Sequence, residues 1–192
     1  MNQSTSFGPA AATRLDDFVA AFSTLLDSGA GEARIVDEGG ALLRQLLAHD
    51  DWLADAVARP DALHYRQYLL YRDPAARFSV VSFVWGPGQC TPIHNHTVWG
   101  LIGLLRGAEI SQDYRPGADG MLRATGAPQR LEAGSVAAVS PTLGDIHQVF
   151  NAWADRVSIG IHVYGADIGA VERAVFTLDG GQKAFRSGYA NA

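Results

Sequence analysis

The sequence predicts a mainly β protein, a sandwich or barrel of short strands that follows a helical N-terminal segment. From about Tyr65 onward, short apolar and β-branched stretches alternate with turns rich in glycine and proline. Many short strands at regular spacing are typical of sandwiches and barrels. Before Tyr65, apolar residues recur every three or four positions, which is the period of a helix with one buried face. We therefore expect a helical extension over residues 1–62 and a β domain over residues 63–192, joined in one structural domain.

Three helices are expected in the extension. The first covers Thr13–Leu26, where the apolar side chains share one face, and the turn at Asp27-Ser28-Gly29 ends it. The second covers Glu32–His49, and a shorter third covers Asp51–Arg59, before Pro60 breaks the helical pattern. A helix with one apolar face must bury that face, so we expect these helices to pack against the outside of the barrel.

Nine strands are expected in the β domain, and turn residues such as Gly86-Pro87-Gly88 and Asp179-Gly180-Gly181 separate them. No internal repeat or low-complexity tract interrupts their succession. The expected strands are Arg66–Arg72, Phe78–Trp85, Val98–Arg106, Ala108–Pro116, Met121–Leu131, Ser135–Pro141, Ile146–Ala152, Arg156–Tyr164 and Ala170–Leu178.

Composition and charge exclude several classes of protein. An apolar content of 47% and a charged content of 18% over 192 residues indicate a packed core rather than a disordered chain. The net charge of −5 is unlike that of a nucleic-acid binder, and no apolar run is long enough to span a membrane. The single cysteine, Cys90, excludes an internal disulfide and fits a reducing compartment. We therefore expect a cytoplasmic protein with neither nucleic acid nor membrane as a partner.

Three of the six histidines form a pattern that indicates a metal site. His94 and His96 are two residues apart in an extended segment, so their side chains point to the same side and converge, as a metal ion requires. His147 follows a second glycine-containing turn further along the chain. His49 ends a helical segment and His64 lies between the two halves, so we assign both to ordinary structural or surface roles.

These histidines lie in two stretches that resemble the two motifs of the cupin superfamily. The first is Gly88-x5-His94-x-His96 followed by Gly107, and the second is Gly134-x6-Pro141-x2-Gly144-x2-His147-x3-Asn151. The resemblance implies a cupin β-barrel, which is a double-stranded jelly roll. It also implies that a metal ion binds to His94, His96 and His147.

The first motif departs from that of most cupins, which supply a glutamate four or five residues after the second histidine. Those positions hold Gly100 and Leu101 here. The expected ligands are therefore three neutral imidazoles, which leave the metal its full charge and open coordination positions. Imidazole binds iron and zinc alike, so the ligand type alone does not fix the metal.

From about Tyr65 to Leu178 the chain resembles the bacterial thiol dioxygenases of the cysteine dioxygenase family, most closely the 3-mercaptopropionate dioxygenases. The resemblance rests on the segments Phe78–Gly88, Trp99–Gly107 and Ile161-His162-Val163-Tyr164-Gly165. It implies a non-haem Fe(II) oxidoreductase whose partners are a small thiol and O2. The enzyme would convert the thiol to its sulfinic acid. It also implies that His162 and Tyr164 are catalytic residues that lie beside the metal.

Two positions differ from those of related enzymes. The family carries serine two residues before the catalytic histidine, whereas this chain has Gly160 there and its nearest serine at Ser158. Eukaryotic cysteine dioxygenases carry, at the position of Gly100, a cysteine that cross-links to the tyrosine. Glycine cannot form that cross-link.

The resemblance also offers residues that would bind the substrate carboxylate, for which a bidentate arginine is the best partner. Arg66 lies near the arginine of cysteine dioxygenases, while Arg173 and Gln67 fall where 3-mercaptopropionate dioxygenases carry their arginine and a glutamine. These positions favour 3-mercaptopropionate or a related thiol such as mercaptosuccinate. L-cysteine is the alternative substrate. A metal-binding cupin without dioxygenase activity, such as a sensor or a sugar isomerase on zinc or manganese, is the alternative function. The sequence does not indicate an oligomeric state.

Overall fold

Two antiparallel sheets form the β domain in the computed structural model, which describes residues 9–192 and, within the first helix, side chains from Thr13 onward. The first sheet has the order β1 (Arg66–Arg72), β2 (Ser79–Trp85), β9 (Ser158–Tyr164), β4 (Gly100–Arg106) and β7 (Val136–Val139). The second has the order β11 (Gln182–Phe185), β10 (Arg173–Phe176), β3 (Ile93–His94), β8 (His147–Asn151), β5 (Ala108–Pro116) and β6 (Leu122–Glu132).

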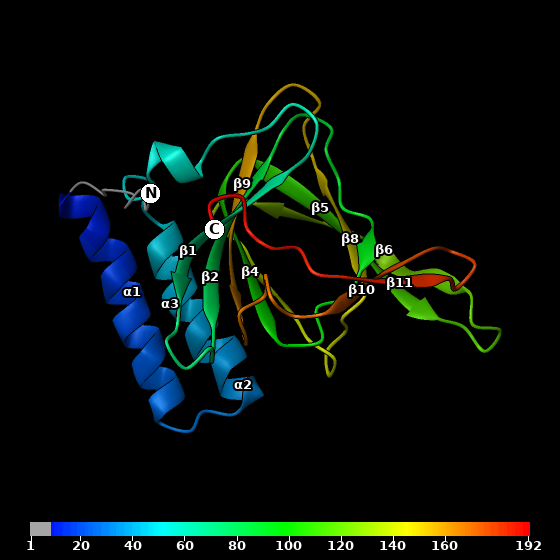
Figure 1. The fold of residues 1–192 in the computed structure, drawn as a ribbon, viewed down its shortest axis with the longest axis horizontal. Helices are drawn as coiled ribbons and strands as arrows, with labels where there is room; N and C mark the ends of the chain where they lie inside the picture. Colours follow the sequence, from blue (N-terminus) through cyan, green and yellow to red (C-terminus); the bar gives the residue numbers. More distant parts are fainter. Residues whose placement is uncertain (1–8) are drawn as a thin grey trace.

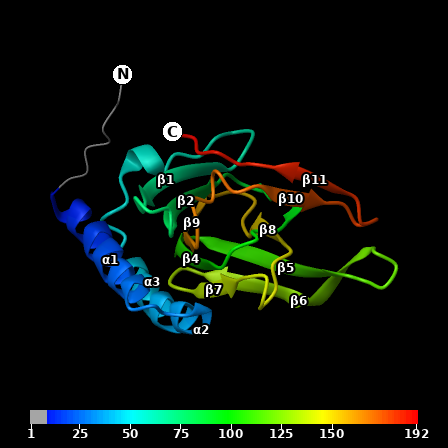
Figure 2. The same ribbon diagram turned by 60° about the horizontal axis from the view of Figure 1, so that its bottom comes forward.

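The chain passes repeatedly from one sheet to the other after β2 (Figures 1 and 2). The predicted fold class is therefore confirmed: a mainly β protein with two antiparallel sheets and helices near its N-terminus. All nine expected strands are present, several with shorter ends. The strands β3 and β11 were not predicted, because β3 has only two residues and β11 is mostly exposed.

Helices cover the first sheet on one side only (Figure 1). Helix α1 covers Pro9–Asp27, and α2 (Glu32–Arg34), the π-helical turn η1 (Ile35–Gly39) and α3 (Gly40–Leu47) follow one another as a second helical segment. Both agree with the sequence-based expectation, and the division of the chain at residue 62 stays a prediction. No helix in the described part of the chain is long and apolar enough to cross a membrane.

The expected third helix over Asp51–Arg59 is wrong, because only the short 3-10 turn η2 (Asp55–Val57) forms there. Tertiary contacts determine this segment instead of helical periodicity. The buried indole of Trp52 donates a hydrogen bond to the carbonyl oxygen of Leu46 at 3.2 Å, near the end of α3. Asp51 binds Arg14 of α1 through two hydrogen bonds.

Strand β9 separates the helical side of the sheet from the barrel interior. Ile159, Ile161 and Val163 pack with the helices in one apolar core. The alternate residues of the strand, among them His162 and Tyr164, face the barrel interior because side chains of a strand alternate between faces. On neighbouring β4, a Cβ atom at Gly103 would lie 2.7 Å from Leu47, so glycine lets α3 approach the sheet closely. The helices thus support the back of the strand that carries two candidate catalytic residues.

Candidate metal centre

His94, His96 and His147 form one buried cluster in the barrel interior. His94 of β3 lies directly opposite His147 of β8 in the antiparallel ladder, and His96 follows two residues after His94. The candidate ligand atoms all lie within 4.8 Å of one another. The sequence-based triad is therefore assembled, with a geometry that could hold a metal ion.

Each imidazole is oriented by a partner on its Nδ1 atom. The Nδ1 atom of His94 lies 3.1 Å from the carbonyl oxygen of Pro92, and that of His147 lies 3.1 Å from Oγ of Ser111. The Nδ1 atom of His96 lies 3.1 Å from Oδ1 of Asp145. These contacts leave the three Nε2 atoms for a metal ion, and such outer contacts usually raise metal affinity.

Asp145 does more than contact one imidazole. Its carboxylate also accepts hydrogen bonds from the backbone N–H groups of His96 at 3.0 Å and Thr97 at 2.9 Å. Thr97 has a φ of 62°, which is unusual for a residue other than glycine, and the two backbone bonds hold it there. Asp145 therefore fixes both the imidazole and the backbone of His96. The sequence left this role open, since no spacing rule connects Asp145 with His96.

Burial makes the three imidazoles neutral ligands. Burial and the neighbouring imidazoles hold the pKa values of His94 and His147 well below the ordinary value. Burial also lowers the pKa of His96, although Asp145 opposes this shift. A neutral imidazole offers a lone pair to a cation, so the cluster suits a divalent metal ion such as iron or zinc.

Tyr164 and His162 approach the cluster from the opposite sheet. The ring of Tyr164 stacks on that of His96, with ring centroids 5.5 Å apart. The Tyr164 hydroxyl lies 3.0 Å from Nδ1 of His162, whose ring stacks on Phe83 at 4.2 Å. Gly100 lies opposite Tyr164 in the β4–β9 ladder, where a Cβ atom would be 2.8 Å from the tyrosine ring. The structure thus brings both candidate catalytic residues to the metal cluster.

Arg173 reaches the same region from β10, the strand beside β3. Val175 lies opposite His94. The next residue pair is joined by two hydrogen bonds, one from the Asn95 N–H to the Ala174 carbonyl oxygen and one from the Ala174 N–H to the Asn95 side chain. Arg173 therefore lies alongside His96 on the same face. Its buried guanidinium lies over Phe185 and donates a hydrogen bond to Oγ of Ser187 at 2.7 Å. Within the described residues it forms no ion pair, and its Nε atom has no partner.

The two remaining candidates lie on β1 and differ in their surroundings. Gln67 pairs with Phe83 across the sheet, and its Oε1 atom is buried without a partner among the described residues. The side chain of Arg66 is 44% exposed and forms an ion pair with Asp61 at 2.5 Å. The structure therefore places Gln67 beside Phe83 on the interior side of the sheet and does not bring Arg66 to the metal cluster.

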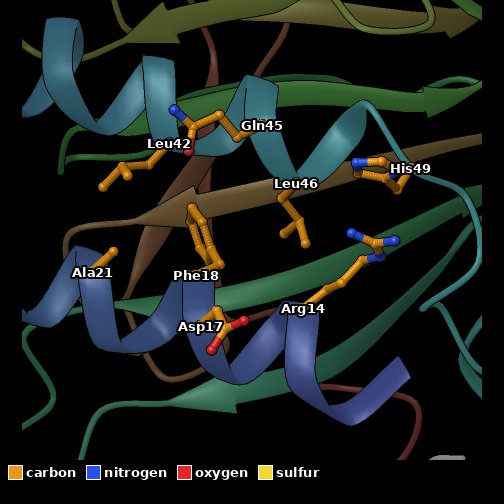
Figure 3. Close-up of a pocket in the computed structure, with 8 residues that line it drawn as sticks. All are labelled: Arg14, Asp17, Phe18, Ala21, Leu42, Gln45, Leu46 and His49. Atoms are coloured by element: carbon orange, nitrogen blue, oxygen red, sulfur yellow. The ribbon is translucent and has the colours of Figure 1, made fainter. Parts of the chain in front are cut away.

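Two hollows differ in their relation to this cluster. One, of about 340 Å³, lies between the sheets and is lined by His147 together with Glu109, Ser111 and Asp113. Another, of about 410 Å³, lies outside the barrel between α1 and α3, where Phe18 and Leu42 meet (Figure 3). The second hollow contains none of the candidate site residues, whereas the interior one contains His147, and a further hollow of about 300 Å³ contains Arg173.

The chain matches no known protein-family model. Several solved structures are similar to part of it. A protein with a double-stranded β-helix domain from Klebsiella pneumoniae is 21% identical over 63% of this chain and 86% of its own, with a TM-score of 0.47. A Cupin 2 conserved barrel domain protein from Salinispora arenicola is 24% identical over 60% and 86%, with a TM-score of 0.43. A cupin superfamily protein from Desulfitobacterium hafniense is 12% identical over 57% and 84%, with a TM-score of 0.44.

Proposed function

We propose that this protein is a non-haem Fe(II) thiol dioxygenase. It adds both oxygen atoms of O2 to the sulfur of a small thiol carboxylate and so forms the sulfinic acid. The substrate is 3-mercaptopropionate or a similar thiol such as mercaptosuccinate. One observation carries the proposal: a buried arginine without an anionic partner lies beside three neutral histidines and a tyrosine hydroxyl.

Arg173 supplies the binding site for the carboxylate. A buried guanidinium is costly to keep without a counter-charge, because burial removes its hydration. A substrate carboxylate provides that charge and can accept two parallel hydrogen bonds from the guanidinium. Ser187 occupies only one donor group, Nη2, and Phe185 supports one face of the guanidinium. The remaining donors are therefore available to a ligand.

Tyr164 and His162 supply and orient a proton next to the reacting atoms. Burial raises the pKa of Tyr164, so its hydroxyl stays protonated and can donate a hydrogen bond into the interior. His162 fixes the hydroxyl through its Nδ1 atom, and Phe83 holds the His162 ring. Fe(II), when bound by the three histidines, supplies the redox chemistry that joins O2 to the thiolate. Phe83 and Ile102 belong to the apolar wall that keeps water out.

The location of Arg66 supports a thiol carboxylate over L-cysteine. Arg66 lies near the position where cysteine dioxygenases carry their carboxylate-binding arginine. In this chain, however, the Arg66 side chain pairs with Asp61 and does not reach the metal cluster. L-cysteine would also need an acceptor for its ammonium group.

Oxygen uptake by the Fe(II)-loaded protein tests the proposal. We expect thiol-dependent uptake with 3-mercaptopropionate or mercaptosuccinate and less with L-cysteine. An Arg173→Gln variant should raise KM by roughly 30-fold or more, because it loses a charge-assisted pair of about 2 kcal/mol or more. Arg186→Gln is the matched control, since Arg186 is exposed and pairs with Glu172. Absence of uptake with all three thiols would refute the activity, and an unchanged KM would refute the role of Arg173.

A further inference from the structure

Glu109 is a buried carboxyl group to which neither the metal cluster nor the proposed reaction gives a role. It lies near the start of β5 and is 3% exposed. Its Oε1 atom accepts a hydrogen bond of 3.3 Å from Oγ of Ser158 on β9. It also lines the interior cavity that reaches His147. Burial raises its pKa to about 8, so the carboxyl group is mostly neutral at pH 7 and has a proton to donate.

The His162 imidazole lacks one hydrogen-bond partner within the described part of the chain. Its Nδ1 atom contacts the Tyr164 hydroxyl, but its Nε2 atom is buried and has no hydrogen-bond partner among the described residues. A buried polar atom without a partner is costly, by about 1–3 kcal/mol. The imidazole therefore lacks a group that would fix which of its nitrogens carries the proton.

Gly160 lies between Glu109 and His162. A Cβ atom built on Gly160 would lie 2.6 Å from Nε2 of His162 and 3.2 Å from Oε1 of Glu109. These two distances limit the separation of Nε2 and Oε1 to about 5.8 Å at most, and no side chain at residue 160 stands between the two atoms. One water molecule with two hydrogen bonds of about 2.8 Å spans a separation of that size.

We propose that Glu109 is a positioning residue for Tyr164, linked to Nε2 of His162 by a water molecule over Gly160. The proposal rests on the proposed function, since the orientation of Tyr164 matters only if its hydroxyl serves a reaction. The Glu109 carboxyl donates to the water, and the water donates to Nε2. The imidazole then carries its proton on Nδ1 and donates to the Tyr164 oxygen. The Tyr164 O–H is thereby left free to point toward the metal cluster.

The arrangement explains how this chain manages without a serine at position 160. A serine hydroxyl there would contact Nε2 of His162 directly. Glycine removes that donor, and the carboxyl group on the neighbouring sheet takes its place from a greater distance. The prediction that follows is interdependence: Glu109 is needed only as long as residue 160 has no hydroxyl group.

Nitrogen-15 NMR of the full-length chain, labelled at histidine and loaded with diamagnetic Zn(II), tests the link without turnover. The His162 signals are assigned by their loss in His162→Gln. We expect the proton on Nδ1 in the unmodified chain and in Glu109→Gln, whose amide still donates. We expect it to move to Nε2 in Glu109→Leu. Ser82→Ala is the control, because Ser82 is another buried hydroxyl without a partner among the described residues and lies on the helical side of β2.

Oxygen uptake by the Fe(II)-loaded variants gives the second measurement. Glu109→Leu should lower kcat by about tenfold or more with little change in KM, as for other residues that orient a reacting group. Adding Gly160→Ser should restore kcat to within a few-fold, after a slight shift of the imidazole. An unchanged His162 tautomer in Glu109→Leu, or no rescue by Gly160→Ser, would overturn the proposal. If the Fe(II)-loaded protein takes up oxygen but the His162 tautomer does not change in Glu109→Leu, only the link through Glu109 is refuted. If the tautomer changes but no thiol-dependent oxygen uptake occurs, only the proposed function is refuted.

Discussion

Replacing Glu109 with glutamine should change how the stability of the protein depends on pH. In the folded protein, burial raises the pKa of Glu109 to about 8, whereas the carboxyl of the unfolded chain titrates near its ordinary value of 4.5. Between these values the folded state holds one proton more than the unfolded state. The stability of the wild-type protein therefore falls as pH rises through this window.

The size of the effect follows from the pKa difference. One pKa unit corresponds to about 1.4 kcal/mol, so ionising the buried carboxyl costs about 5 kcal/mol over the whole window. Below pH 4.5 both states hold the proton, and above pH 8 both have lost it, so the effect is confined to the interval between. Glutamine has a similar shape and cannot ionise. The stability of Glu109→Gln relative to wild type should thus increase by about 3 kcal/mol from pH 5.5 to pH 7.5.

Urea unfolding at a series of pH values, with both proteins free of metal, measures this difference. All other titrating groups are common to the two proteins, so they cancel in the comparison. Glu132→Gln is the control, because Glu132 is exposed, and its unfolding free energy should run parallel to that of wild type. A difference between Glu109→Gln and wild type that stays constant from pH 5.5 to pH 7.5 would refute the reasoning. It would mean that Glu109 is already ionised in the folded protein.

Three further predictions concern other parts of the molecule. Asp145→Ala should weaken metal binding by roughly 10- to 100-fold in competition with a chelator, because His96 loses its Nδ1 partner; equal affinity with the exposed-site control Asp155→Ala would contradict this. Gly103→Ala should destabilise the fold by about 1–3 kcal/mol in urea unfolding, because the added methyl group would lie within 3 Å of Leu43 and Leu47 of α3. An unchanged midpoint would show that α3 can move away freely. Trp52→Phe should cost about 1 kcal/mol, because the bond to the Leu46 carbonyl is lost, and a gain in stability would contradict that role.

Local patterns in the sequence were sufficient for most of the strands and for part of the metal cluster. Strand periodicity and turn residues placed the nine main strands. The separation of His94 and His96 by one residue puts both side chains on one face, whereas His147 was assigned by the resemblance to the second cupin motif, and the register of β3 against β8 explains why it joins them. The helix expected over Asp51–Arg59 failed for the opposite reason. The Trp52 contact to the end of α3, which no local pattern records, determines that segment.

Local sequence patterns could not identify the residues that orient the side chains of the site. Asp145 and His96 are 49 positions apart in sequence, and so are Ser158 and Glu109. Ser111 meets His147 from 36 positions away. These pairs depend on which strands become neighbours and in which register. Glu109 in particular looks like an ordinary charged residue in the sequence, and only its burial against β9 distinguishes it.

The charge balance of the interior bears on which thiol fits best. Arg173 is the one arginine or lysine that is buried in the described part of the chain. The buried imidazoles are neutral, Tyr164 keeps its proton, and Glu109 is mostly protonated below pH 8. With a divalent metal ion bound as proposed, the metal and Arg173 would leave the interior positive, even after the carboxylates of Asp145 and Asp113 are counted. A thiolate with a carboxylate brings two negative charges and compensates this excess. L-cysteine would add an ammonium group to an already positive cavity, so the electrostatics favour a thiol that carries acid groups alone.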